Sequence, residues 1–383
     1  MEVTSVKRIH QADWTDSGVR FFRARDIVSS MNNEEVDNPV FISEDKYEEY
    51  SRISGKVIEG DLLVTGVGTI GVPYLIKDST PLYFKDGNII WFKNNNILNG
   101  EYFYYCFQNN SIQSQIYSAS GKGTVGTYTI ENGKKTSISY PSLKEQVKIG
   151  KLLDTMAIMI TLHQRKLEHL NLKKKALLQK LFPKNGERYP ELRFPGFTDA
   201  WEQRKLGDFT NQINTFVNPE DAKLPLWSLT AEAGLIEKSD RYERDFLVKK
   251  KDQYKRIETN TLVYNPMNIT IGSIDIYTGL YPIAVSGYYV SIVYDKNIDT
   301  DFLKEVLLLP SSLKMYKNYA TGSLIERQRV QYPTFSKLQL LLPNLDEQKA
   351  IGQIFKSLNL NITLHQKEPF LCENSVNSGV KLC

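Results

Sequence analysis

The chain contains one segment twice, and this repeat limits the folds that the sequence can adopt. PSLKEQVKIGKLLDTMAIMITLHQRK begins at Pro141 and aligns without a gap on PNLDEQKAIGQIFKSLNLNITLHQKE, which begins at Pro343. The 202 residues between the two starting points far exceed the few tens of residues in a solenoid repeat. We therefore expect two large modules, each followed by the same helix.

Both copies carry the signals of a helix start. Ser142 and Glu145 match the capping-box pattern, and Asn344 and Glu347 repeat it. Downstream, residues recur at alternating spacings of four and three, which is typical of a coiled-coil seam. The first seam comprises Ile149, Leu153, Met156, Ile160, His163, Leu167, Leu170, Lys174, Leu177 and Leu181, and the second comprises Ile351, Phe355, Leu358, Ile362 and His365.

Two matching seams predict an antiparallel helix pair that acts as a spacer of fixed length. Its first helix, about 38 residues long, would extend about 57 Å. His163 and His365 occupy the same seam position, where a metal pair or a pH switch is conceivable. Neighbouring carboxylates or cysteines are missing from the sequence there, so we interpret both histidines as packing residues. Pro369 is expected to break the second helix. The predicted interface comprises Ile149, Leu153, Met156, Ile160, His163, Leu167, Ile351, Phe355, Leu358, Ile362 and His365.

The modules themselves have the composition of mixed α/β structure. Short runs rich in Val, Ile, Tyr and Phe alternate with Gly and Asn, which predicts strands and turns. One helix is expected over 99–117 and one over 301–319. The predicted fold class is α+β, with two mixed α/β domains joined and spaced by two long antiparallel coiled-coil helices. The expected boundaries are 1–141 for the first module, 142–183 for the spacer helix, 184–342 for a linker plus the second module, 343–368 for the distal helix and 369–383 for a divergent tail.

Several function classes are disfavoured by the residues. No apolar run approaches the 18 residues of a membrane span, and the first residues lack a signal-peptide core, so a cytoplasmic protein is expected. Cys106, Cys372 and Cys383 are too scattered for a disulfide framework or a zinc site, so no metal site is predicted. Acids and histidines form no recognisable catalytic set either. We expect a protein without catalytic residues of its own.

Gly66, Gly68 and Gly71 formally match the dinucleotide-binding pattern, with Asp86 at a suitable distance. The residues that follow Gly71 have the composition of a strand and include Pro73 and Pro81, whereas a phosphate site needs a helix N-terminus there. We therefore exclude a nucleotide site.

Charge is unevenly distributed. The net charge of +4 is a weak argument for a polyanionic partner, but residues 163–184 carry seven Lys or Arg side chains against Glu168 alone. This run is either the solvated face of a helix near its C-terminus or a surface that binds a partner.

The arrangement of modules and repeated helices resembles the specificity subunit of bacterial type I restriction-modification systems. The resemblance covers about residues 10–368. It rests on the Pro-x-Leu-x-Glu-Gln start of each helix, on its Leu-His-Gln end, and on ELRFPGFTDAWEQRKLGDF, which begins at Glu191 and is similar to the lead-in to a target recognition domain. The segments beginning at Thr15 and Lys223 are similar to early parts of such domains. A matching lead-in to the first module would precede Met1, so we expect it to be missing, and the subunit's activity is left open.

The resemblance implies a subunit that binds double-stranded DNA and reads a bipartite, asymmetric target, one half-site per module. It implies two modification (methyltransferase) subunits as partners, which carry S-adenosylmethionine and methylate adenine, and restriction (motor-nuclease) subunits that use ATP and Mg²⁺. No cofactor is expected in this chain. Basic and amide side chains on loops suit base and phosphate contacts. The candidate DNA-binding residues are Arg23, Arg25, Lys122, Thr124, Asn265, Asn268, Ser323, Arg327 and Arg329.

Two alternatives remain. A non-enzymatic coiled-coil scaffold with two protein- or glycan-binding modules is compatible with the weak net charge and predicts no salt-dependent DNA binding. A free-standing methyltransferase or nuclease predicts S-adenosylmethionine binding or DNA cleavage by the isolated chain.

Overall fold

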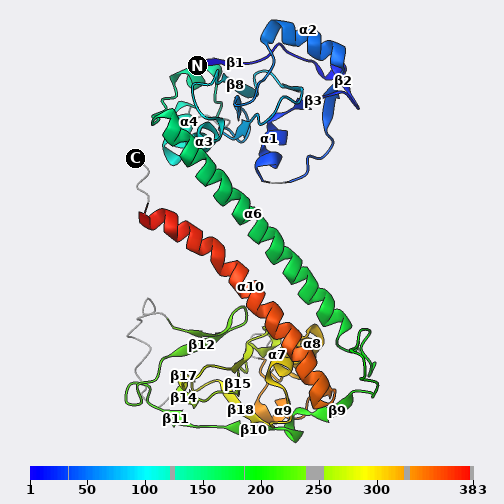
Figure 1. The fold of residues 1–383 in the computed structure, drawn as a ribbon. Coiled ribbons are helices and arrows are strands. Elements are labelled where there is room, and N and C mark those ends of the chain that lie inside the picture. The colour runs from blue at the N-terminus through cyan, green and yellow to red at the C-terminus, as the bar shows by residue number, and fades with distance from the viewer. Residues whose placement is uncertain (33, 121–125, 185, 239–253, 323–327, 380–383) are drawn as a thin grey trace. The chain divides into compact units, whose positions relative to one another are not determined.

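The computed structural model describes residues 1–32, 34–120, 126–184, 186–238, 254–322 and 328–379, with the backbone alone for 367–379. The chain divides into two compact units, Met1–Leu162 and His163–Cys383. The division falls inside one long helix, α6 (Leu143–Lys180), so this helix contributes residues to both units (Figure 1).

Unit 1 is built on two four-stranded sheets. One has the strand order β1-β8-β5-β6 and is antiparallel throughout, and the other has the order β2-β4-β3-β7, with β3 and β7 parallel. All four residues of β5 are buried, as expected for a central strand that is covered on both faces. The strands are β1 (Glu2–Thr4), β2 (Trp14–Thr15), β3 (Val19–Phe22), β4 (Val40–Ile42), β5 (Leu62–Thr65), β6 (Pro73–Leu75), β7 (Leu82–Phe84) and β8 (Ile89–Lys93).

The helix expected over 99–117 is two helices. α3 ends at Gln108 and α4 begins at Asn110, because Asn109 lies in an extended conformation and its side chain accepts a hydrogen bond from the Ser111 amide at 2.8 Å. An Asn cap of this kind competes with continuation of the first helix. The helices of unit 1 before α6 are α1 (Ala24–Met31), α2 (Glu44–Ser54), α3 (Gly100–Gln108), α4 (Asn110–Ala119) and α5 (Ile130–Lys135).

Unit 2 repeats the first of these sheets. Its strand order β10-β18-β15-β16 is again antiparallel throughout, and three smaller sheets, β11-β14-β17, β12-β13 and β19-β9, accompany it. The strands are β9 (Glu202–Lys205), β10 (Thr210–Ile213), β11 (Phe216–Val217), β12 (Trp227–Thr230), β13 (Gly234–Glu237), β14 (Tyr254–Ile257), β15 (Thr261–Tyr264), β16 (Ile274–Tyr277), β17 (Ile283–Ser286), β18 (Val290–Tyr294) and β19 (Gln339–Leu342).

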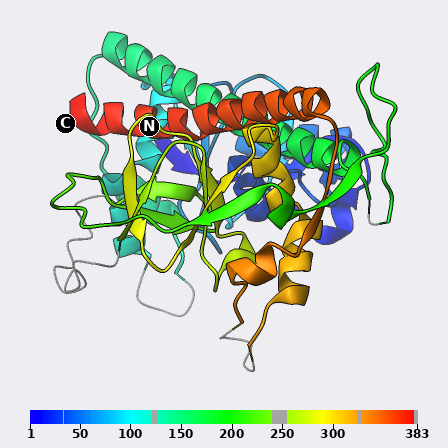
Figure 2. The same ribbon diagram turned by 90° about the horizontal axis from the view of Figure 1, so that it is seen from below.

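The helix expected over 301–319 is also two helices, because Pro310 has no amide to donate into a continuing helix and takes the first position of the second one. Figures 1 and 2 show α7 between α10 and the sheet. The helices of unit 2 after α6 are α7 (Thr300–Leu308), α8 (Pro310–Tyr319), α9 (Tyr332–Phe335) and α10 (Leu345–Gly379). None of the helices within the described residues is long and apolar enough to cross a membrane.

The repeated Glu-Gln-x-x-Ile-Gly stretch attaches each long helix to its own unit. The side chain of Gln348 accepts a hydrogen bond from the Asp299 amide at 3.0 Å and donates one to the Pro343 carbonyl at 2.9 Å. Gln146 makes the same pair of bonds with Asn99 and Pro141. Asp299 and Asn99 are the N-caps of α7 and α3, so the glutamine fixes the long helix at the start of the neighbouring helix.

Within unit 2, the second half of α6 and the middle of α10 run antiparallel. His163 Nδ1 lies 2.9 Å from His365 Nδ1, and Lys174 Nζ lies 2.7 Å from Asn359 Oδ1. The later residue on α6 thus contacts the earlier residue on α10, which is the order of an antiparallel pair. Ile351, Phe355, Leu358 and Ile362 belong to the core of this unit, and Leu167 packs against that core. Ile149, Leu153, Met156 and Ile160 lie in unit 1, where each is half-buried.

The expectation that Pro369 ends the distal helix is wrong. α10 continues through Pro369 to Gly379. A proline inside a helix removes one backbone hydrogen bond and strains the preceding turn, and the helix here tolerates that cost rather than terminating.

Candidate nucleic-acid interface

The same pair of surface elements recurs on the shared sheet of each unit. In unit 2, the turn between β15 and β16 is joined to the loop between α8 and α9, because the Val330 amide donates to the Pro266 carbonyl at 3.0 Å. In unit 1, the turn between β5 and β6 is joined to the loop between α4 and α5, because the Tyr128 amide donates to the Gly66 carbonyl at 2.9 Å. Each unit therefore displays one turn and one loop that start from a common base.

Both loops are closed at their bases by backbone hydrogen bonds. The Thr127 amide donates to the Ser120 carbonyl at 3.2 Å in unit 1. In unit 2, Thr321 and Arg329 exchange two backbone bonds of 2.9 Å and form an isolated antiparallel bridge. These bonds hold the two ends of each loop together. The predicted DNA-binding residues Lys122, Thr124, Ser323 and Arg327 lie outside the described residues.

In unit 2, Asn265 shapes the turn and Asn268 is displayed by it. Asn265 accepts a hydrogen bond from the Met267 amide on its side chain at 3.1 Å, and its own amide donates to the Ser273 carbonyl at 3.0 Å. Asn268 is exposed and makes no side-chain capping bond to the short 3₁₀ helix that follows it. The side-chain amide of Asn268 can therefore donate a hydrogen bond to a bound partner and accept one from it.

Arg329 is exposed at the base of the loop, with its guanidinium 5.7 Å from the ring of Tyr288. Tyr288 is 43% exposed and was not selected from the sequence. An Arg stacked on an exposed aromatic ring offers both a charge for phosphate and a flat surface for a base. The sequence signal for Tyr288 was the Tyr-Tyr pair at 288–289, which directly follows a glycine.

In unit 1, the glycine pattern that begins at Gly66 is this turn. A side-chain carbon at Gly66 would lie 2.5 Å from the Tyr128 carbonyl oxygen, so only glycine permits the close approach of the loop. Gly68 and Gly71 have φ angles of +79° and +80°. Gly71 is followed by strand β6, antiparallel to β5, instead of the helix that a dinucleotide phosphate requires.

The two arginines chosen on α1 have different environments. The Arg23 guanidinium donates to both oxygens of the fully buried Asp26 at 2.9 Å and to the Asn38 carbonyl at 3.0 Å. These bonds hold the start of α1 and engage Nε and Nη2 of Arg23 within the protein. Arg25 has 62% of its side chain exposed, with Nε 3.9 Å from Asp26. α1 packs against β6, the strand that leaves the glycine turn.

The described part of the chain contains no group of three or more His, Cys, Asp or Glu side chains placed to hold a metal ion. The surface elements of the two units thus carry amide, hydroxyl, guanidinium and aromatic groups, which are chemically suited to binding and readout.

The sequence model described as "Type I restriction modification DNA specificity domain" matches residues 17–172. No curated protein sequence matches the chain significantly. The structure is similar to the crystal structure of a type I restriction-modification S subunit from M. genitalium, with 12% identity and a TM-score of 0.57 over 98% of this chain and 91% of that one.

Two further solved structures are similar with lower scores. One is an HsdS subunit from Thermoanaerobacter tengcongensis, with 14% identity and a TM-score of 0.39 over 93% of this chain and 88% of that one. The other comes from work on complex assembly in a type I R-M system, with 13% identity and a TM-score of 0.42 over 98% and 91%. Residues 17–172 thus match a type I restriction modification DNA specificity domain, and the α+β fold with long helices is similar to that of a solved S subunit.

Proposed function

We propose that this chain is the specificity subunit of a type I restriction-modification system and reads a split, asymmetric sequence on double-stranded DNA, with one half-site for each unit. The observation that supports this proposal is the repeated pair of turn and loop on the same antiparallel sheet. The framework is shared while the displayed residues differ: a glycine turn in unit 1 and Asn265 to Asn268 in unit 2. Different side chains on equal frameworks predict two different half-sites.

We propose separate roles for the candidate residues. Arg25, Asn268 and Arg329 are exposed and would contact DNA, together with Lys122, Thr124, Ser323 and Arg327 from the two loops. Asn268 suits the edge of an adenine, to which Asn commonly makes two hydrogen bonds. Arg23 and Asn265 are engaged within the protein, so they would position α1 and the turn.

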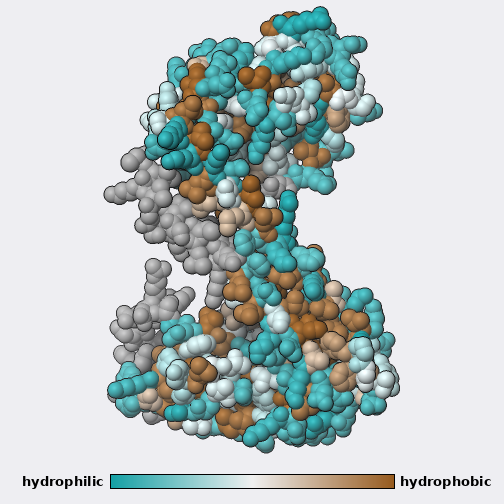
Figure 3. Space-filling view, viewed as in Figure 1, coloured by the Kyte–Doolittle hydropathy of each residue, from teal (hydrophilic) through white to brown (hydrophobic). Residues whose placement is uncertain are grey.

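Catalysis would belong to partner subunits. Two modification subunits carrying S-adenosylmethionine would methylate adenine after flipping it from the helix, and restriction subunits using ATP and Mg²⁺ would join for cleavage. Exposed leucines on the helix pair of unit 2 support a docking role, since Leu172 is 67% exposed and Leu360 is 60% exposed. Figure 3 shows hydrophobic side chains among polar ones along this part of unit 2.

Methylome sequencing tests this proposal directly. A host that carries this subunit with its modification partners should contain one split adenine-methylated motif, and deletion of the subunit should remove it. The absence of any such motif, with partners expressed and assembled, would contradict DNA reading by this chain.

A single substitution then assigns one unit to one half-site. Asn268→Ala should relax or change one half of the motif and leave the other half intact, with a loss of about 1 to 3 kcal/mol at the affected base pair. Asn297→Ala is the matched control. Asn297 is also exposed, but it follows the C-terminal end of β18, whereas the turn between β15 and β16 lies beside the N-terminal end of that strand. Equal effects of the two substitutions, or changes in both halves, would argue against separate readers.

A further inference from the structure

In unit 2, the segment 191–206 covers the start of the long helix. Nε and Nη2 of Arg193 each donate to one carboxylate oxygen of Glu347 at 2.8 Å, and the side chain of Glu347 is only 1% exposed. A carboxylate buried to this degree requires a partner of opposite charge. The arginine of this segment therefore completes the helix start.

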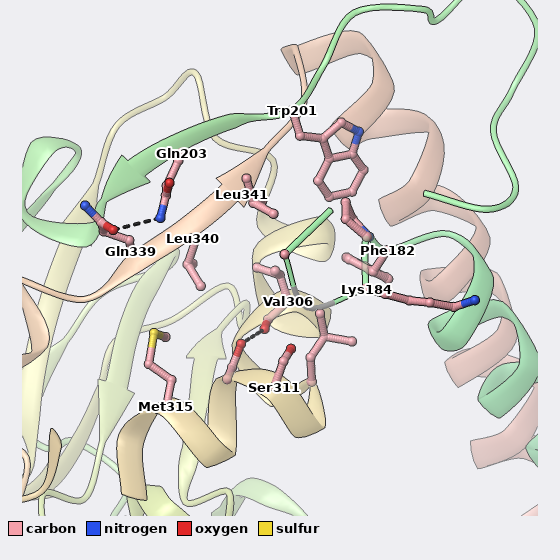
Figure 4. A pocket seen from close by; sticks show the side chains of 14 residues that line it. Phe182, Lys184, Trp201, Gln203, Val306, Ser311, Met315, Gln339, Leu340 and Leu341 are labelled. Carbon is pink, nitrogen blue, oxygen red and sulfur yellow. Dashed lines mark hydrogen bonds between the residues drawn. The ribbon is translucent and has the colours of Figure 1, made fainter. Parts of the chain in front are cut away.

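The same segment then adds a strand and an aromatic anchor. β9 pairs antiparallel with β19, and Leu342 at the end of β19 is 3% exposed. Trp201 is 1% exposed, with its ring 5.9 Å from Phe182 and 5.8 Å from Phe302 on α7. Figure 4 shows Trp201 beside Phe182 in a cavity of about 250 Å³, and the bond of 2.7 Å between Gln203 and Gln339 across the two strands.

The equivalent surface of unit 1 is exposed. Tyr140, which corresponds to Leu342 in the repeat, is 56% exposed, and Leu143 is 55% exposed. Glu145, the counterpart of Glu347, is exposed and has no ion-pair partner among the residues that the structure describes. The helix start that is covered in unit 2 is thus open in unit 1.

The backbone beside it is open as well. Within the described residues, the amides and carbonyls of Ile138 and Tyr140 make no hydrogen bond, whereas their counterparts Leu340 and Leu342 pair with β9. The carbonyls of Ser137 and Ser139 are bonded on the other side of this stretch, by Gln115 and by Tyr102. An edge strand shows the same alternation: the backbone groups of every second residue face a neighbour, and those of the residues between them stay unpaired.

A receiving surface for the aromatic anchor is also present. Counted from the N-cap of its helix, Tyr102 on α3 corresponds to Phe302 on α7, and Cys106 corresponds to Val306, which lines the cavity beside Trp201. Both Tyr102 and Cys106 are only half-buried. The ring and the thiol can pack against an indole as Phe302 and Val306 do.

We propose that residues 138–145 of unit 1, with Tyr102 and Cys106, form a docking site for an extended segment with the chemistry of residues 191–206: an arginine, a tryptophan eight residues later and a following strand. Charge complementarity at Glu145 and the seated example in unit 2 identify this occupant. Binding proceeds by strand addition, in which main-chain bonds supply affinity and the two anchors supply specificity. The inference goes beyond DNA reading and does not depend on it.

A labelled synthetic peptide, ELRFPGFTDAWEQRKL, tests the site on the full chain by fluorescence anisotropy. The peptide should bind, and Glu145→Gln should weaken binding at least tenfold, as should Arg193→Ala in the peptide. Combining both changes should give no further loss, because they remove the same ion pair. Lys144→Gln is the matched control, since its side chain is exposed one residue away. Hydrogen exchange should show peptide-dependent protection at the amides of Ile138 and Tyr140.

Among the described residues, the Glu145 side chain makes no hydrogen bond or ion pair, so Glu145→Gln should leave folding unchanged and loss of binding can be attributed to the site. The segment already attached to unit 2 resists displacement, because it is tethered at a high effective concentration. Absence of peptide binding, equal affinity for the Glu145→Gln chain, or protection confined to unit 2 would each overturn the proposal. Self-association through residues 138–145 without peptide binding would overturn it in favour of a second copy of the chain.

Discussion

At the scale of single residues, the repeated motif is explained by two positions. Gln348 is 3% exposed and satisfies one amide and one carbonyl at the start of α7 and α10. Gly352 lies one turn later, where a side-chain carbon would stand 2.8 Å from the Phe302 amide nitrogen and closer still to the Asp299 carboxylate. The pair Gln146 and Gly150 does the same in unit 1. Their identity in both copies reflects a shared packing requirement within each unit.

Gly352→Ala should therefore reverse the usual effect of such a change. Replacing glycine by alanine inside a helix ordinarily stabilises it by about 1 kcal/mol. Here the added methyl group meets backbone at the start of α7, so we expect the free energy of unfolding to fall by about 1 to 3 kcal/mol. Urea unfolding measures it. Ser357→Ala, at an exposed position of the same helix, should be neutral or slightly stabilising, and equal stabilisation of both variants would contradict the packing explanation.

Residue roles were harder to predict than residue types. Arg23 and Arg25 are equivalent as charges in the sequence, yet only Arg25 is free of a bidentate partner. The carboxylate that binds Arg23 is three residues away, and its complete burial depends on β3 and the other strands of unit 1, which a local pattern does not contain. Tyr288 was missed for the same reason, since its pairing with Arg329 joins positions far apart in the chain.

At the scale of elements, the first long helix was predicted well, whereas the end of the second one and the short helices were not. The cap and seam patterns place the first helix within a few residues of α6 (Leu143–Lys180). The breaks at Asn109 and Pro310 were overlooked, although both residues carry the local signal. The opposite error occurred at Pro369, which was given too much weight as a helix breaker.

A polar group at the contact of three helices offers a test of element packing. Lys174 on α6 donates to Asn359 on α10 at 2.7 Å, and both Lys174 and Asn359 donate to Glu305 on α7, whose side chain is 7% exposed. A polar residue in an apolar seam fixes register at some cost in stability.

Lys174→Met should lower the free energy of unfolding by about 2 kcal/mol, because the buried Glu305 loses its counter-ion. Glu305→Gln should cost less in the Lys174→Met background than in the parent chain, giving a coupling of about 0.5 to 3 kcal/mol in a double-mutant cycle. Urea unfolding of the four proteins measures the coupling. Lys173→Met, at an exposed neighbour, should have little effect. Additive losses would show that the three helices do not depend on this pair.

At the scale of the whole molecule, the architecture followed from the repeat, but the surfaces did not. A repeated helix separated by about 200 residues is enough to predict two modules, and the sheet order shared by the two units agrees with a common plan. The turn and loop that face outward on each unit arise from hydrogen bonds between strand ends and distant loops, such as that of Tyr128 with Gly66. Sequence periodicity contains no information about such pairings.

The continuous helix α6, which contributes to both units, predicts how target spacing should respond to its length. A seven-residue insertion between Leu153 and Leu162 adds about 10 Å, close to the length of three base pairs at about 3.4 Å each. It preserves the phase of the seam within about 20°. Methylome sequencing should then show both half-sites unchanged and the gap between them altered. A four-residue insertion adds about 6 Å with a rotation of about 40°, so we expect it to impair methylation more than the longer insertion does. An unchanged gap with either insertion would mean that α6 does not set the spacing.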